Sequence, residues 1–485
     1  MSKALVLGDI MLDVTVECEV SRGSPEAPVL VGKEFSRTST LGGAANVAAN
    51  LVSLGVDDVH LGGVIGHDTA GEQIETWCGK FGIKLLREYR TGQRTTVKSR
   101  YTSNGQLIFR HDSERHWHAS APPSMRGQSD IDVLDYDVIV FADYNKGMVG
   151  DYDVGSLIAK ANVAGVPVVV DCKPCNLPAF AGATFITPNE AELTEMYSLH
   201  LPTGRNPLPA EDAGRLATTY DIRWVVCTRG SAGLDIYSVE KNRFGWMVAA
   251  GADQPLRLLP KQRRRVYDVT GAGDVVTAAI AAQLARAQGP DTEMFEFANT
   301  AAGLAVEQPG TTVVSRDAVV SALARDRLAS KIVSAEEVAA PAFSPDCVVF
   351  TNGCFDLLHP GHVYLLREAK REGDILIAAV NSDESVRALK GEERPVLPLH
   401  LRMAALASVA AVDWVVSFDE ETPEALIRKI KPDVLVKGKL TEECPHQNDP
   451  VPGADFMAAR GARIVFIDTI PGYSTTAVLA AGGIS

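Results

Sequence analysis

The sequence has few aromatic residues, no excess of positive charge and no long apolar run. Aromatic residues make up 6% of its 485 residues, and 61 Asp and Glu outnumber 47 Lys and Arg, for a net charge of −14 at pH 7. This acidity argues against a generic binder of nucleic acid or of anionic membranes. The apolar runs are too short to cross a bilayer. We therefore expect neither nucleic acid nor membrane as a partner.

Cysteine is also sparse, and its spacing does not suggest a disulfide framework. The scattered pattern is typical of reduced thiols in an intracellular protein. The apolar start at Ala4–Leu7 turns polar at Asp9 and is too short for a secretory signal. Because the sequence shows no targeting signal, we expect the protein to be cytoplasmic. The eight cysteines are Cys18, Cys78, Cys172, Cys175, Cys227, Cys347, Cys354 and Cys444.

The length predicts two or three domains, and the pattern of apolar runs predicts an α/β fold. Near-continuous apolar runs are typical of strands buried on both faces, and helical stretches at Ala44–Leu54 and Asp151–Ala164 lie between them. The segments Val29–Phe35 and Thr95–Arg110 instead alternate apolar and polar residues, which predicts a half-exposed antiparallel flap. The predicted buried strands are Ala4–Leu7, Val138–Phe141, Val168–Val170, Phe185–Ile186 and Trp224–Cys227.

A small, proline-bearing segment at Ala339–Pro345 predicts a linker. Just before it, Ser334 and Glu337 have the spacing of a helix capping box. We expect a kinase domain over 1–335, a linker over 336–345 and a second domain over 346–485. The second domain is expected to be a smaller parallel α/β unit with strands at Val349–Asn352, Ile375–Val380, Trp414–Ser417, Val434–Val436 and Arg463–Ile467.

The first chemical motif is the glycine-rich segment Asp268–Asp274, which precedes an Ala-rich helix over Val275–Leu284. Glycines at a helix start leave backbone N–H groups free to face an anion, as a transferring phosphoryl group requires. Asp274 lies in the first turn, where it can accept the proton of an attacking hydroxyl. The alternative is a purely structural role, in which the segment is a glycine-rich turn and the aspartate caps the helix.

Three further segments favour the phosphoryl-transfer interpretation. Asn46 follows a second glycine pair by one helical turn, and Asp13 after the first strand can hydrogen-bond sugar hydroxyls. Asn189 and Glu192 are expected on one helical face. The Glu192 carboxylate can organise Mg²⁺ and its waters.

These segments, in this order, resemble the ribokinase-like (PfkB) sugar kinases over about 3–325. Two further segments, Ser21–Val29 and Ala142–Gly147, are similar to the heptose-phosphate kinase branch. The resemblance implies a three-layer α/β fold with a small β lid that often forms a dimer contact. It implies Mg²⁺ with ATP, and it leaves a monovalent cation as a second candidate cofactor. The resemblance implies that Asp274 is the base and that the anion hole is formed by Gly271, Ala272 and Gly273. It implies that the sugar is bound by Asp13, Gly42, Gly43 and Asn46, and the phosphate of the sugar by Arg110 and Lys146. The residues implied to lie towards ATP are Lys173, Asn189, Glu192, Thr228, Gly230 and Asn299.

The second motif is His359–His362, which follows a strand and a glycine-containing loop and begins a helix over Val363–Arg371. Two imidazoles there can donate hydrogen bonds to a phosphate while charge moves onto a leaving pyrophosphate. Holding the two reactants in the correct geometry is enough for this transfer, and no covalent intermediate with the protein is needed. The alternative is a turn with two solvent-exposed histidines.

Together with the preceding Thr351–Leu358, this motif resembles the cytidylyltransferase-like nucleotidyltransferases, which have a Rossmann-like fold. The match spans about 348–476, and the order of the two parts resembles the bifunctional heptose 7-phosphate kinase/heptose 1-phosphate adenylyltransferase family. It implies His359 and His362 as catalytic residues. The implied nucleotide- and phosphate-binding residues are Thr351, Asn352, Gly353, Phe355, Lys437, Ser474, Thr475 and Thr476.

Two departures from the family's pattern bear on adenylyl transfer. Lys439 and Leu440 stand where an acidic–aromatic pair is usual, and Ala477–Ser485 lacks the usual basic residue. The loss of a phosphate-facing cation would weaken triphosphate binding.

We therefore expect a chain that phosphorylates heptose 7-phosphate at C1 and transfers an adenylyl group to heptose 1-phosphate. A separate phosphatase must remove the C7 phosphate between the two steps, and a homodimer or larger homo-oligomer is expected through the lid. The alternative is a kinase for another sugar phosphate, fused to an altered or non-catalytic nucleotide-binding module.

Overall fold

The computed structural model describes the chain except for residues 90–93, 115–130, 202–208, 239–255, 260–266, 287–288, 309, 340–346, 440–450, 469 and 471–485. It divides into two compact units, Met1–Leu323 and Ala324–Ser485. Among the described residues no helix is both long enough and apolar enough to span a membrane.

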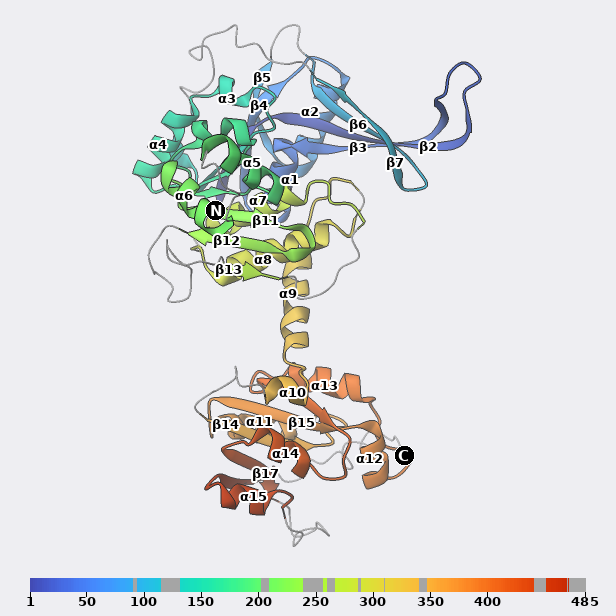
Figure 1. The fold of residues 1–485 in the computed structure, drawn as a ribbon, viewed down its shortest axis with the longest axis vertical. Coiled ribbons are helices and arrows are strands. Elements are labelled where there is room, and N and C mark those ends of the chain that lie inside the picture. Colours follow the sequence, from blue (N-terminus) through green and yellow to red (C-terminus); the bar gives the residue numbers. More distant parts are fainter. Residues whose placement is uncertain are drawn as a thin grey trace. The chain divides into compact units, whose positions relative to one another are not determined.

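The first unit is built on one nine-stranded sheet (Figure 1). Its strands pair in parallel except at the β11–β12 and β12–β13 edge, where they are antiparallel. The sheet order is β13-β12-β11-β10-β9-β8-β1-β4-β5. The strands are β1 (Lys3–Gly8), β4 (Asp58–Ile65), β5 (Lys84–Tyr89), β8 (Val138–Ala142), β9 (Val168–Asp171), β10 (Phe185–Ile186), β11 (Trp224–Thr228), β12 (Leu234–Ser238) and β13 (Leu256–Leu258).

Helices cover both faces of this sheet, because side chains of the buried strands alternate between two apolar cores. In β1, Ala4 and Val6 join one core, and Leu5 and Leu7 join the other. The predicted three-layer α/β fold is confirmed. The first core holds α1 (Ala44–Ser53), α2 (Thr69–Phe81), α7 (Ala272–Leu284) and α8 (Thr292–Ala305). The second holds α3 (Met148–Asp151), α4 (Val154–Ala164), α5 (Glu190–His200), α6 (Pro209–Thr219) and the 3-10 helices η3 (Val133–Asp135) and η4 (Pro174–Phe180).

One helix is shorter than the sequence predicts. Instead of a single helix over Asp151–Ala164, the chain ends α3 at Asp151 and begins α4 at Val154. The break occurs because Asp153 takes non-helical backbone angles and caps α4, accepting a hydrogen bond from the Ser156 N–H at 3.2 Å.

The predicted flap is a second sheet of the first unit, with strand order β3-β2-β6-β7. It is not wholly antiparallel, since β2 pairs with β6 in parallel. The reason is that β4, α2 and β5 lie between them in the chain and form a crossover. The outer part of β3 is also exposed on both faces, with Leu30 60% and Phe35 68% exposed. The strands are β2 (Ile10–Gly23), β3 (Leu30–Gly43), β6 (Thr96–Ser103) and β7 (Gln106–Ser113).

The second unit has a five-stranded parallel sheet in the order β16-β15-β14-β17-β18. This order confirms the predicted Rossmann-like arrangement. Its strands are β14 (Val348–Gly353), β15 (Ile375–Asn381), β16 (Trp414–Phe418), β17 (Val434–Lys439) and β18 (Arg463–Asp468). Its helices include α11 (Pro360–Lys370), α12 (Asp383–Lys390), α13 (Leu399–Ala407), α14 (Glu424–Ile430) and α15 (Ala454–Ala459).

A segment ahead of β14 packs into this second unit. After α9 (Arg316–Ser330), the Lys331 ammonium donates to the carbonyl of Val412 at 2.7 Å, and the Val333 N–H donates to the carbonyl of Val415 at 3.0 Å. The short helix α10 (Ala335–Val338) has the expected capping box, and Val338 is buried in a core of the second unit. The boundary at residue 335 remains a prediction, because most of the linker lies outside the described residues.

Val338→Ala tests whether this segment is part of the second unit. Val338 is 5% exposed, so losing two methyl groups should destabilise the second unit by about 1–2 kcal/mol. Hydrogen exchange of β14 and β16 amides in urea would measure this change. Val320→Ala on α9, where Val320 is 44% exposed, is the matched control and should change little. Equal stabilities of the two variants would show that Val338 does not belong to the core.

Candidate functional site

The first site is organised around Asp274, in the first turn of α7. This helix begins after Gly271, whose backbone is left-handed (φ 77°) and where a Cβ atom would lie 3.1 Å from the Asn46 amide nitrogen. The side-chain amide of Asn46, on α1, donates to Oδ2 of Asp274 at 2.7 Å. The Tyr144 hydroxyl donates to Oδ1. Two long-range hydrogen bonds thus fix both oxygens of the carboxylate.

Asp274 has the electrostatic properties of a base that works near neutral pH. It is 7% exposed, and burial raises the pKa of its carboxyl group to about 6. The hydrogen bonds from Tyr144 and Asn46 lower this pKa, and the nearby Asp13 carboxylate raises it. A group with such a pKa is mostly ionised at pH 7 and still basic enough to take a proton.

The predicted sugar-binding residues lie beside Asp274. Asp13 is on β2, and a Cβ atom on Gly42 of the paired strand would come within 2.7 Å of the Asp13 carboxylate, so only glycine fits there. Gly43 has a φ of 56° and accepts no Cβ either, because the Asp9 carbonyl oxygen would be 2.5 Å away. Burial raises the pKa of Asp13, while Arg100 lowers it.

Three cations of the lid face Asp13. Arg100 donates to the Asp13 carboxylate at 3.2 Å. Lys98 is two residues earlier on the same face of β6, and Arg110 is the register partner of Arg100 on β7. Arg110 is held by Asp112 in two hydrogen bonds of 2.7 and 2.5 Å. The lid thus places positive charge next to the predicted sugar site.

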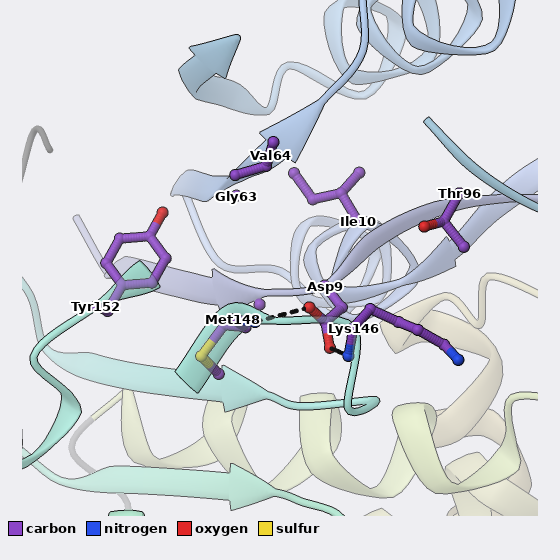
Figure 2. A pocket seen from close by; sticks show the side chains of 9 residues that line it. Asp9, Ile10, Gly63, Val64, Thr96, Lys146, Met148 and Tyr152 are labelled. Carbon is purple, nitrogen blue, oxygen red and sulfur yellow. Dashed lines mark hydrogen bonds between the residues drawn. The ribbon is translucent and has the colours of Figure 1, made fainter. Parts of the chain in front are cut away.

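Asp9 also lines a small pocket of the first unit (Figure 2). The Asp9 carboxylate accepts hydrogen bonds from the backbone N–H groups of Tyr144, Lys146 and Met148, at 2.8, 2.9 and 3.2 Å. The ammonium of Lys146 pairs with Glu114 at 2.5 Å. The pocket is lined by Gly8, Asp9, Ile10, Gly63, Val64, Thr96, Lys146, Met148 and Tyr152.

Four of the residues predicted towards ATP, Lys173, Asn189, Glu192 and Thr228, lie near the carboxyl ends of β9, β10 and β11. Lys173 and Glu192 form an ion pair of 2.5 Å. Glu192 also accepts from the backbone N–H of Asn189 at 3.1 Å, and the Asn189 side chain caps α5 in return, which completes a capping box. Asn189 and Thr228 form a β-bridge.

The other residues of this predicted group are less closely connected. Gly230 begins the turn η5 (Gly230–Ala232), two residues after Thr228, with a φ of 54°. Asn299, on α8, donates to the carbonyl of Leu258, and no contact between Asn299 and Lys173 or Glu192 is among those of the described residues. The described residues contain no group of three or more His, Cys, Asp or Glu that could hold a metal ion by itself.

The second site lies where β14 ends and α11 begins. His359 is the N-cap residue of α11, and its ring stacks on that of His362 with centroids 3.8 Å apart. His359 is 9% exposed, so the interpretation as two solvent-exposed histidines is wrong. Burial lowers the pKa of both imidazoles, that of His362 to about 4, so both are neutral at pH 7. In the described part of the chain, Nδ1 of each ring is buried without a hydrogen-bond partner.

Other predicted nucleotide-binding residues of the second unit belong to β14, to the loop after it and to β17. Phe355 has a left-handed backbone (φ 45°), and its ring lies 5.2 Å from that of His362 and within 3.3 Å of a Cβ built on Gly353. The Lys437 ammonium donates to the Asn352 side chain, and burial lowers its pKa to about 8. The Thr351 hydroxyl is buried without a partner among the described residues. These unused polar groups are suited to receive a ligand.

Two buried charged residues fix the loop between β14 and α11. Asp356 accepts from the backbone N–H of Val396 at 2.7 Å and pairs with Arg394 at 2.6 Å. The fully buried Arg402 donates to the carbonyl of Cys354 at 2.7 Å and to Asp383 at 2.6 Å. The loop that presents both histidines is therefore held from two sides.

The structure adds residues that the sequence analysis did not single out. Tyr144, Lys98 and Arg100 surround Asp274 and Asp13, and alternation along β6 was a signal for the latter two. Ser474, Thr475, Thr476, Leu440 and the end of the chain from 477 to 485 lie outside the described residues. Lys439, which departs from the family's pattern, is described and pairs with Asp468 at 3.1 Å.

Both parts of the chain match known protein families. Residues 1–318 match the pfkB family carbohydrate kinases, and residues 350–476 match the cytidylyltransferase-like family. Solved structures similar to the first part include a ribokinase from Thermotoga maritima (16% identity, TM-score 0.51) and phosphofructokinase-2 from Escherichia coli in complex with potassium (17%, TM-score 0.52). Each covers 67% of this chain and 99% of the other, and the likeness shows the ribokinase-like fold.

Similar curated proteins extend over nearly the whole chain. The "Bifunctional protein HldE" of Azorhizobium caulinodans is 38% identical over 98% of this chain and 97% of its own length. The protein of the same name from Shewanella denitrificans is 37% identical over 99% of this chain and 96% of its own. The chain therefore belongs to the bifunctional HldE proteins, with a pfkB family carbohydrate kinase followed by a cytidylyltransferase-like domain.

Proposed function

We propose that this protein phosphorylates the C1 hydroxyl of D-glycero-D-manno-heptose 7-phosphate with ATP, and transfers an adenylyl group from ATP to heptose 1-phosphate to give ADP-heptose and pyrophosphate. The observation that carries the first activity is the buried Asp274 carboxylate at the start of α7, next to Asp13 and the lid cations. The second rests on the stacked His359 and His362 and on the buried Lys437 of the same unit.

In the kinase reaction the sugar hydroxyl gives its proton to Asp274 while its oxygen forms a bond to the γ-phosphorus of ATP. The bond from that phosphorus to the bridging oxygen breaks, and ADP leaves. The N–H groups of Gly271–Gly273 would face the charge on the transferring group. Asp13 would hold sugar hydroxyls, and Arg110 and Lys146 would hold the phosphate already on the sugar.

Mg²⁺ would enter this site with ATP, whose phosphates supply oxygen ligands that a single carboxylate cannot. The chain's acidic residues suit such an arrangement: burial and the nearby Asp274 and Glu192 carboxylates raise the pKa of Asp171 well above its usual range. A divalent cation would neutralise charge that this group of acids otherwise leaves unbalanced. Glu192 is our candidate to hold its waters.

In the adenylyl reaction an oxygen of the sugar 1-phosphate attacks the α-phosphorus of ATP, and the bond to the leaving pyrophosphate breaks. The neutral rings of His359 and His362 would donate N–H groups to phosphate oxygens. Lys437, with a pKa lowered to about 8, is a cation in a partly dry site. Charge assistance is strongest where water is excluded.

The two reactions require further partners. The kinase product carries two phosphates, so a separate phosphatase must remove the C7 phosphate. The lid leaves apolar side chains exposed, with Leu107 58% and Phe109 53% exposed, which suits contact with a second copy of the chain. Because both reactions use ATP and sugar phosphates, we place them in the cytoplasm.

Asp274→Asn should remove the base and leave the second activity intact. We expect kinase turnover to fall by about 10²–10⁴-fold, since general-base catalysis contributes that much. ADP formation from heptose 7-phosphate and pyrophosphate release from heptose 1-phosphate, measured on the same preparation, would separate the two effects. Asp317→Asn, an exposed acid in the first turn of α9, is the control. Normal kinase turnover in Asp274→Asn would exclude the assigned role.

The kinase activity should depend on pH through Asp274. The ionised form is the base, so kcat/KM should be constant near pH 8 and fall as the pH drops through about 6, the raised pKa of this carboxyl group. A profile of kcat/KM between pH 5 and about pH 8 would show the midpoint. A profile that stays flat down to about pH 5, as an aspartate with its ordinary pKa would give, would contradict the assignment.

His362→Ala should lower adenylyl transfer by about 10²–10³-fold, because it removes a donor aimed at developing charge. Kinase activity should not change. The control is His400→Ala, an exposed histidine on α13 of the same unit. Pyrophosphate release from ATP and heptose 1-phosphate measures the effect, and equal rates for the two variants would remove His362 from the mechanism.

A further inference from the structure

The side chain of Tyr144 reaches the catalytic centre from the loop that follows β8. Its hydroxyl donates to Oδ1 of Asp274. Two lysines lie close to its ring: the ammonium of Lys98 is 5.3 Å from the ring centroid, and that of Lys173 is 5.9 Å away. Lys98 belongs to the predicted sugar side and Lys173 to the predicted ATP side. Tyr144 therefore stands where the two substrates would meet.

The loop that carries Tyr144 is held by two buried carboxylates. Asp9, at the end of β1, accepts three of its backbone N–H groups, as Figure 2 shows for Lys146 and Met148. Asp143 accepts from the N–H of Asn145 at 2.9 Å and from the side-chain amide of Asn176 at 2.8 Å. The loop also contains a non-glycine residue with a left-handed backbone, Asn145, with a φ of 57°.

This anchoring is costly for a loop that only connects a strand to a helix. Burial raises the pKa of Asp9 to about 6, so keeping it ionised as an acceptor opposes stability. Strained backbone persists where surrounding contacts determine it, and such sites are frequent near active centres. The loop's conformation therefore serves the position of Tyr144 rather than the connection itself.

The other groups that face Asp274 come from four elements. Asn46 on α1 donates to Oδ2, and Asp13 on β2 and Lys98 on β6 act at longer range. Asp171, at the end of β9, adds a further carboxylate. The hydrogen bonds from Tyr144 and Asn46 offset the desolvation of the Asp274 carboxylate, and among the described residues only Tyr144 donates to Oδ1.

We propose that Tyr144 is a positioning residue of the kinase reaction: its hydroxyl orients the Asp274 carboxylate towards the sugar hydroxyl and keeps it ionised at neutral pH. No proton moves from Tyr144 in this role, since burial and the neighbouring carboxylates raise the pKa of its hydroxyl well above the usual range. The inference rests on the proposed kinase activity and concerns one residue of the same site.

Tyr144→Phe tests the role in the full-length protein. Loss of a hydrogen bond to a charged group should move the acidic limb of kcat/KM upward by about one pH unit. The ratio of wild-type to variant kcat/KM should be about fivefold larger at pH 6 than at pH 8, because the shifted pKa adds to the loss of orientation only in the lower range. Tyr136→Phe is the control. It removes a hydroxyl that contacts His60 at 2.9 Å and should leave the profile unchanged.

A double mutant separates positioning from a general structural effect. In the Asp274→Asn background, adding Tyr144→Phe should change the remaining activity less than twofold, because the carboxylate through which Tyr144 acts is gone. A loss that is equal at every pH, or that persists in the Asp274→Asn background, would overturn the inference. If the wild-type chain shows no kinase activity on heptose 7-phosphate, the proposed function fails instead.

Discussion

The carboxylate of Asp274 is the constraint around which the first unit is arranged. To keep one ionised acid buried at the start of α7, the fold brings the Asn46 amide from α1 and the Tyr144 hydroxyl from the loop after β8. Gly271 must be glycine so that the helix can start this close to Asn46. Asp9 and Asp143 then hold the Tyr144 loop. Several unusual features of the unit, including strained backbone and buried acids, follow from this single requirement.

In the described part of the chain, the predicted site of the second unit has no buried carboxylate like Asp274, and its charged group is a lysine. Its site contains neutral imidazoles and a partly desolvated lysine, and no carboxylate is placed as a base beside them among the described residues. Burial keeps His359 and His362 uncharged, while Asp356 and Arg402 hold the loop from outside the site. A reaction between two phosphates needs no base, since the attacking oxygen is already ionised. The two sites therefore fit hydroxyl and phosphate nucleophiles respectively.

Sequence motifs predicted the parts of both sites that are local in the chain. Asp274 with its glycines, and His359 with His362, each lie within one strand–turn–helix segment, where spacing fixes geometry. Tyr144 was visible in a motif, but its contact with Asp274 spans 130 residues of sequence and depends on how β8 and α7 pack. To predict that Lys98 and Arg100 lie next to Asp13, one must know the register between β2 and β6. Pairing across a sheet is a tertiary property that no single segment specifies.

The chain cannot join its two proposed reactions by itself, because the kinase product still carries the C7 phosphate. The direct measurement is phosphorus NMR of the wild-type protein with MgATP and heptose 7-phosphate, first alone and then after addition of a phosphatase that removes the C7 phosphate. We expect ADP and a heptose bisphosphate in the first stage without pyrophosphate, and ADP-heptose with pyrophosphate only in the second. Pyrophosphate release before the phosphatase is added, or no bisphosphate at all, would contradict this account.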